Sequence, residues 1–203
     1  MSKNTTHKTM YKLTSEDMKT FAGTEWTVGE WKETSGEGEM CGPGWLHCYE
    51  DPRMAVIFNP IHAVFLKPRL WEIEVAGKHT TDGLKHATTK QRLVREIELP
   101  EIPVDTRVRL AIACVKEVCT DETWLQWAEN YQSTQIPNYT DWYKKIRINP
   151  SAVYRTIGYA ATCAYLARLG GSSHYYSAAS VSFVLQALPD LWVLEMLNKV
   201  MGK

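Results

Sequence analysis

The first half of the chain alternates apolar and polar positions. Residues 70–75 place Trp71, Ile73 and Val75 on one side and acidic residues on the other, which predicts a half-buried strand. Residues 88–99 are predicted as a second strand, and the turn-rich segment 78–85 joins the two. Shorter strands are predicted at residues 11–13 and 25–31, and residues 40–49 are predicted as a Gly-Pro loop that runs into a further short strand.

One short helix is predicted inside this sheet region. Asp51 has the chemistry of an N-cap, and Pro52 suits the first helical position. The helix is expected to run to about residue 58, where Asn59 and Pro60 end it.

The pattern changes after residue 100, where apolar residues recur at helical spacing. Helices are predicted at residues 105–119, 120–131, 141–147, 151–169, 173–188 and 190–200. The fold class is therefore α+β, a small mixed or antiparallel sheet domain with one short helix, followed by an all-helical C-terminal half. The domains are a flexible tail at 1–10, the sheet domain at 11–100 and a helical region at 104–203.

Composition narrows the function classes. The 203 residues carry 23 Lys and Arg against 23 Asp and Glu, and this balance argues against binding to duplex nucleic acid. The polar start is typical of neither a signal nor a transit peptide, and no apolar run reaches the roughly 18 residues of a membrane span. We expect a cytoplasmic protein whose five cysteines are free thiols.

Residues 11–99 resemble an uncharacterised protein family of tailed phages and prophages. The family pattern runs Cys-x-x-Gly-aromatic-His-x-Cys and continues into a Pro-containing helix start, as residues 41–52 do here. Asp82 and Lys85 match later positions of the pattern. Leu46 departs from it, because it separates Trp45 from His47. The resemblance implies a phage accessory protein in the cytoplasm of a bacterial host cell, where it acts on a host or immune-system protein or a small nucleotide.

A looser resemblance, at fold level, is to ADP-ribosyltransferase domains. The Gly-rich turn, the strand with Tyr49 and the following Pro-started helix carry it. This resemblance implies NAD as a cofactor and a late catalytic Glu, for which Glu96 and Glu98 are the candidates, with His47 and Tyr49 as partners. The alternative function is therefore an NAD- or nucleotide-processing enzyme.

The main hypothesis is a binding protein without a cofactor or turnover, because no convergent catalytic set is visible. Glycines 42 and 44 let backbone amides approach a ligand, and His47 lies just behind them. A base could stack on an exposed tryptophan, Trp31 or Trp45, while Lys90 or Arg92 of the basic run 85–95 contacts a phosphate. The predicted ligand-binding residues are Gly44, Trp45, His47, Tyr49, Lys90 and Arg92.

His47 has three other interpretations. It could act as a general acid or base that Glu50 or Asp51 orients. It could brace the Gly-Pro loop by bonding to the backbone, or it could join a zinc site with Cys41 and Cys48, completed by Cys114 and Cys119. The Cys and His spacing is poor for zinc, so no metal is the primary prediction.

Aromatic residues mark a candidate partner surface in the second half. They could equally form the seam between the halves. Because the predicted C-terminal helices are apolar on most sides, we also expect a homodimer. The surface residues are Trp124, Trp127, Tyr131, Trp142 and Trp192.

Overall fold

The chain divides into two units, residues 1–101 and 102–203, which are described separately. The structure is a computed structural model that describes residues 9–20, 23–63, 65–83, 85–116, 119–130 and 193–201.

A long antiparallel hairpin organises the first unit. Its strands are β4 (Arg69–Thr81) and β5 (His86–Ile97). β4 is longer than the alternation predicted, whereas β5 begins and ends two residues before the predicted strand. The first half of the expected turn at residues 78–85 is strand, because the pairing continues past an irregularity between Ala76 and His79 and β4 ends only at Thr81. Gly77 makes this possible with φ of +80°, and a Cβ there would collide with the Thr89 side chain.

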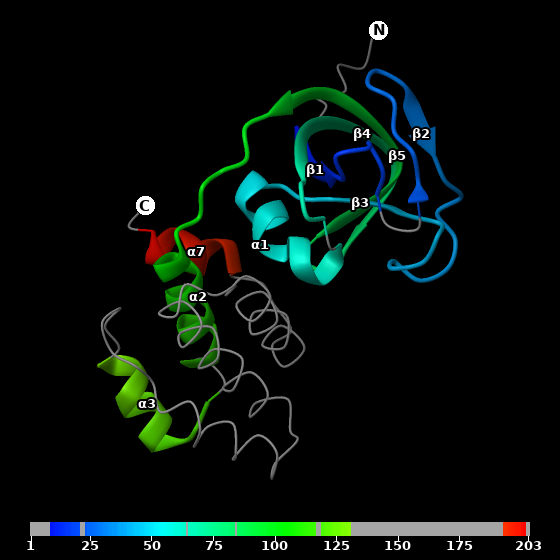
Figure 1. The fold of residues 1–203 in the computed structure, drawn as a ribbon. Coiled ribbons are helices and arrows are strands. Elements are labelled where there is room, and N and C mark those ends of the chain that lie inside the picture. Colours follow the sequence, from blue (N-terminus) through cyan, green and yellow to red (C-terminus); the bar gives the residue numbers. More distant parts are fainter. Residues whose placement is uncertain are drawn as a thin grey trace, which may run out of the picture. The chain divides into compact units, whose positions relative to one another are not determined.

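The remaining strands curl the sheet into a closed ring (Figure 1). β1 (Met10–Thr14) pairs with β4, and β3 (Leu46–Cys48) pairs with the start of β5. Tyr11 and Tyr49 exchange two backbone hydrogen bonds of 2.8 Å. These bonds connect the residue after β3 to β1 and so close the ring. β2 (Trp31–Glu33) pairs farther along β5, and only its first residue, Trp31, falls within the strand predicted at 25–31.

The inner face of the ring is mostly apolar but includes the buried polar side chains of Lys12 and Gln91. The ammonium of Lys12 donates to the carbonyl of His47 at 2.5 Å and to Gln91 Oε1 at 3.0 Å, and it lies 4.6 Å from the Trp26 ring centre. Burial lowers the pKa of Lys12 to about 8. Around it lies a core cluster made of Met10, Trp26, Leu46, Cys48, Trp71, Ile73 and Leu93.

Helix α1 (Pro52–His62) packs against β1. Its predicted start is confirmed, since Asp51 caps the helix by accepting from the Arg53 amide at 2.8 Å. Its predicted end is wrong, because the helix continues through Pro60 to His62. A proline in a helix removes one backbone hydrogen bond, because it has no N–H. In the last turn this loss is tolerated where the ring does not clash with the preceding turn.

The predicted all-helical C-terminal half is wrong. The described structure is mostly antiparallel sheet with few, short helices, of which the second unit has α2 (Val104–Lys116), α3 (Glu122–Glu129) and α7 (Val193–Val200). Apolar spacing reports only a local amphipathic tendency, which does not determine how much of a region becomes helix. The helices predicted at 141–147, 151–169 and 173–188 lie outside the described residues.

Within the second unit, α2 packs against α7 and contacts α3. The buried residues of α2 include Val108, Ile112 and Val115, which recur at helical spacing. Asp121 caps α3 and accepts from the Trp124 amide at 3.1 Å. Among the described residues, no helix has the length and apolar character needed to cross a membrane.

Candidate functional site

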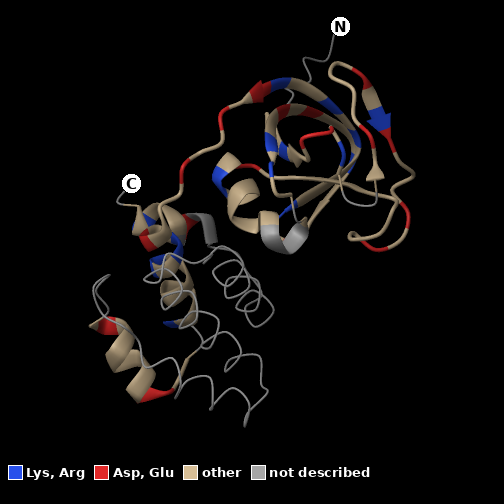
Figure 2. Cartoon of the chain, in the orientation of Figure 1, with Lys and Arg blue, Asp and Glu red and all other residues tan. Residues whose placement is uncertain are grey.

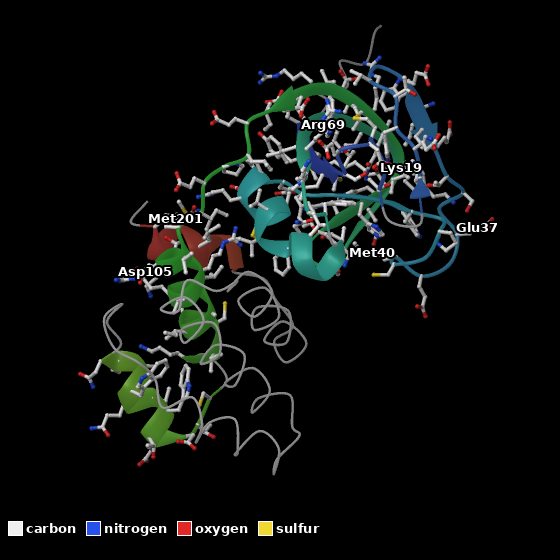
Figure 3. The ribbon with its side chains drawn as sticks, viewed as in Figure 1. Lys19, Glu37, Met40, Arg69, Asp105 and Met201 are labelled. Atoms are coloured by element: carbon white, nitrogen blue, oxygen red, sulfur yellow. The ribbon has the colours of Figure 1, made fainter. Side chains whose placement is uncertain are left out.

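His47 braces the loop that precedes β3. Met40 lies on this loop (Figure 3), and its carbonyl accepts a hydrogen bond of 2.7 Å from His47 Nε2. Burial lowers the pKa of His47, and the neighbouring ammonium groups of Lys12 and Lys85 lower it further. A neutral ring bonded to its own loop matches the structural interpretation of this residue.

The glycines of the loop serve its internal packing. Gly36 donates to the Gly44 carbonyl at 2.8 Å, so the loop closes on itself. A Cβ on Gly44 would collide with the backbone of Glu37, which the loop carries at its outer side (Figure 3). The close approach that the sequence predicted for a ligand is therefore made by the protein's own chain.

The other predicted ligand residues near this loop have structural partners. Trp45 is half-buried, and its Nε1 donates to the Gly38 carbonyl at 3.3 Å. Tyr49 is buried, which raises the pKa of its phenol and keeps it neutral. Asp51 occupies the N-terminus of α1 and is itself paired with Arg53 at 2.5 Å.

The candidate catalytic residues are separated along the hairpin. His47 pairs in register with Ala87 near the start of β5, whereas Glu96 lies nine residues farther along the same strand. Glu96 accepts two hydrogen bonds from Arg69, at 2.9 and 2.6 Å, and Glu98 is exposed beyond the strand's end. This arrangement does not give the transferase alternative its convergent set.

The zinc alternative is not assembled either. Cys41 is exposed, whereas Cys48 is buried on β3, and burial raises the pKa of its thiol to about 12. A buried neutral thiol is a poor metal ligand. In the part of the chain that the structure describes, no three His, Cys, Asp or Glu side chains are grouped to hold a metal ion.

Two of the predicted ligand residues, Lys90 and Arg92, meet an exposed aromatic ring. Trp31 is 37% exposed, and its ring centre lies 4.9 Å from the Arg92 guanidinium carbon and 5.5 Å from Lys90 Nζ. We call these three residues the Trp31 platform. Trp26 and Trp71 are buried in the core, so exposure distinguishes Trp31 from these two where the sequence alone could not.

Strand register explains why the platform forms. Arg92 stands opposite Trp31 of β2 and opposite Glu74 of β4, so the three side chains form a row across three strands. Lys90 stands in the next row, opposite Glu33. Directly opposite residues share a face of the sheet, and this face is the outer one.

The platform cations have carboxylate partners. Lys90 pairs with Glu33 at 3.2 Å, and Arg92 pairs with Glu74 through Nη2. Acidic and basic residues are interspersed along β4 and β5 (Figure 2). Glu33 is largely exposed, and an exposed pair of this kind is worth only about 0–1 kcal/mol.

The rest of the basic run is used elsewhere. Lys85 is buried and pairs with Asp82, and Arg95 pairs with Glu72 at 2.6 Å. His86 contacts Glu50 and His79. The strand therefore supplies two cations, Lys90 and Arg92, to the platform.

The predicted partner surface in the second unit is covered only in part by the described residues. Trp124 is fully buried, and its ring centre lies 5.7 Å from that of the half-buried Trp127. Trp124 therefore belongs to a core. Tyr131, Trp142 and Trp192 lie outside the described residues, as does most of the surface invoked for a homodimer, which stays a prediction.

Comparison with known proteins gives one family. Residues 8–105, a little under half of the chain, match a domain of unknown function, DUF7666. This span contains the ring of strands, the loop braced by His47 and the Trp31 platform. The comparisons with curated proteins and with solved structures give no match.

Proposed function

We propose that the sheet domain is a cytoplasmic, non-catalytic binding module for a nucleotide-like anion, and that the Trp31 platform is its binding surface. The observation that carries the proposal is the exposed indole of Trp31 with the cations of Lys90 and Arg92 over its ring. An aromatic base would stack on the indole, and its phosphate would lie against Lys90 and Arg92.

The chemistry of the platform fits such a ligand. Stacking of one base on an aromatic side chain contributes about 1–3 kcal/mol. Arg92 has five N–H donors, and its pair with Glu74 is made through Nη2, so donors remain for a phosphate oxygen. Lys90 can exchange the exposed carboxylate of Glu33 for a phosphate with little loss.

The same contacts predict a modest, salt-sensitive affinity. The ligand has to displace or share carboxylates that already neutralise both cations, and exposed ionic contacts are screened as salt rises. The accessory role on a host component that the phage resemblance implies stays a prediction, and it is compatible with a module that binds without turnover.

Calorimetric titration of the full chain tests the proposal. The ligands are ADP, ADP-ribose, NAD and a cyclic nucleotide at low salt. We expect binding by at least one of them, at least a tenfold loss of affinity in Trp31→Ala, and no change in the matched control Trp45→Ala. Glu33→Gln removes the carboxylate that competes for Lys90, so this variant should bind more tightly than the wild type.

Two outcomes would refute the proposal. The first is a titration in which folded protein gives no heat of binding with any of the nucleotides. Trp31 would then be interpreted as a contact for a protein partner. The second is binding that Trp45→Ala abolishes and Trp31→Ala preserves, which would return the site to the loop before β3.

A further inference from the structure

A carboxylate and two imidazoles form a chain at the closed end of the β4–β5 hairpin. Glu50 Oε1 lies 3.1 Å from His86 Nε2, and His86 Nδ1 lies 2.8 Å from His79 Nε2. His79 comes from β4 and His86 from β5, and Glu50 follows β3. Neither the platform nor the loop braced by His47 uses this trio.

The two imidazole rings meet edge to edge. Their planes differ by 11° and their centres lie 5.0 Å apart. The distance between the ring centres nearly equals the 2.8 Å between the two nitrogens plus the distance from each ring centre to its nitrogen. The two centres and the two nitrogens therefore lie almost on one line, and the nitrogens face each other in the plane of both rings. Each lone pair or N–H is therefore directed at the opposite nitrogen.

The carboxylate fixes where the protons are. An ionised Glu50 only accepts, so His86 carries its proton on Nε2 and presents the lone pair of Nδ1 to His79. His79 fills this position with the proton on its own Nε2. Two nitrogens thus share a single proton, and its removal would leave two lone pairs converging on one point.

We propose that this point is a metal site, in which His79 Nε2 and His86 Nδ1 chelate a divalent transition-metal ion such as Zn²⁺, Ni²⁺ or Cu²⁺. The ion takes the place of the shared proton, and the neutral His79 ring keeps this proton by carrying it on Nδ1 instead of Nε2. Imidazole is a preferred ligand of these ions, whereas Mg²⁺ and Ca²⁺ prefer oxygen. Glu50 is the supporting partner: a carboxylate on the far N–H of a metal-bound histidine orients the ring and raises its basicity.

The fit requires only a small rearrangement. Zinc–nitrogen bonds of about 2.0–2.1 Å at a tetrahedral angle separate the two nitrogens by roughly 3.3 Å, slightly more than in the hydrogen-bonded pair. His79 is exposed and can supply this movement, while His86 is held by Glu50. The described residues add no third His, Cys, Asp or Glu, so water or an external ligand completes the coordination.

The site is independent of the proposed nucleotide module and is tested with the metal ion alone. Full-length protein carries Cys41→Ser, because the exposed thiol would itself bind these ions. Titration with ZnCl₂ or NiCl₂ should give one site in the micromolar range and a rise in melting temperature. His79→Gln and His86→Gln should each lose at least tenfold in affinity, and Glu50→Gln about ten- to a hundredfold.

Two controls make the test decisive. His47→Gln alters a histidine bonded to its own loop and should leave the affinity unchanged, and MgCl₂ should give no binding. Folding of each variant is checked by circular dichroism. Micromolar binding that His79→Gln leaves intact would overturn the proposal, and so would the absence of binding by folded wild-type protein below millimolar metal.

Discussion

Lys12 Nζ lies 3.0 Å from Gln91 Oε1 inside the ring of strands, and the lysine side chain is only 5% exposed. Its other hydrogen bond, to the His47 carbonyl, is also to a neutral acceptor, and the Trp26 ring lies beside it. The protein thus keeps an ammonium group in its core with neutral contacts. This arrangement explains why the pKa falls to about 8.

Lys12 predicts a pH dependence of stability. The unfolded chain keeps the proton up to about pH 10.5 and the folded protein releases it near pH 8, so the burial penalty is full below pH 8 and is relieved as the pH rises. Lys12→Met removes the penalty. Its free energy of unfolding relative to the wild type should fall by about 2 kcal/mol between about pH 7 and pH 9.5.

Urea unfolding of both proteins across this range measures the difference. The raised pKa of Cys48 acts in the opposite direction above about pH 9, since the unfolded thiol ionises first, but it is present in both proteins and largely cancels. A difference that stays constant with pH would contradict the buried position of this ammonium.

His47→Ala should destabilise the domain without affecting the platform. The variant loses the hydrogen bond to the Met40 carbonyl, for which about 1–2 kcal/mol is expected. Because the pKa of folded His47 is lowered, the wild type should also lose stability as the pH falls below about 6.5, and the variant should lose less. Thermal unfolding at neutral and acidic pH reads out both effects.

Gly77→Ala and Gly38→Ala form a matched pair. Both glycines have similar positive φ, +80° and +77°, so an alanine introduces similar backbone strain of about 1–2 kcal/mol in each. Only Gly77 faces a collision, with Thr89, whose Oγ1 accepts from the Lys78 amide at 2.9 Å. Chemical denaturation should show Gly77→Ala the less stable by a further 1 kcal/mol or more, on the order expected for overpacking. Equal losses would mean that the Thr89 contact is dispensable.

The sequence predicted the local chemistry of the sheet domain better than its extent. The alternation around Trp71 identified β4, and Asp51 with Pro52 identified the start of α1. The hairpin extends farther than predicted because Gly77 absorbs an irregularity that reads as a turn in sequence. In the second unit, the described helices α2, α3 and α7 are shorter than the segments whose apolar spacing predicted helices, because local periodicity does not determine where a helix begins and ends.

The candidate site shows a similar limit. Lys90 and Arg92 lie two residues apart on one strand, so strand alternation places them on the same face, and the register agrees. The choice between Trp31 and Trp45 depends on which ring the rest of the chain covers. The position of Trp31 follows from the pairing of β2 with β5, which cannot be deduced from composition. His79 and His86 are seven residues apart, and only the cross-strand register brings their nitrogens together.

The central claim is that Trp31 is the ring on which a nucleotide stacks. The eight tryptophans give indole N–H signals in a ¹H–¹⁵N NMR spectrum, and Trp31→Phe assigns the signal of Trp31 by its loss. On addition of the tightest-binding nucleotide, we expect that signal to shift progressively to saturation, while the Trp45 signal, assigned with Trp45→Phe, stays in place. A Trp31 signal that remains unmoved at saturating nucleotide would contradict the account.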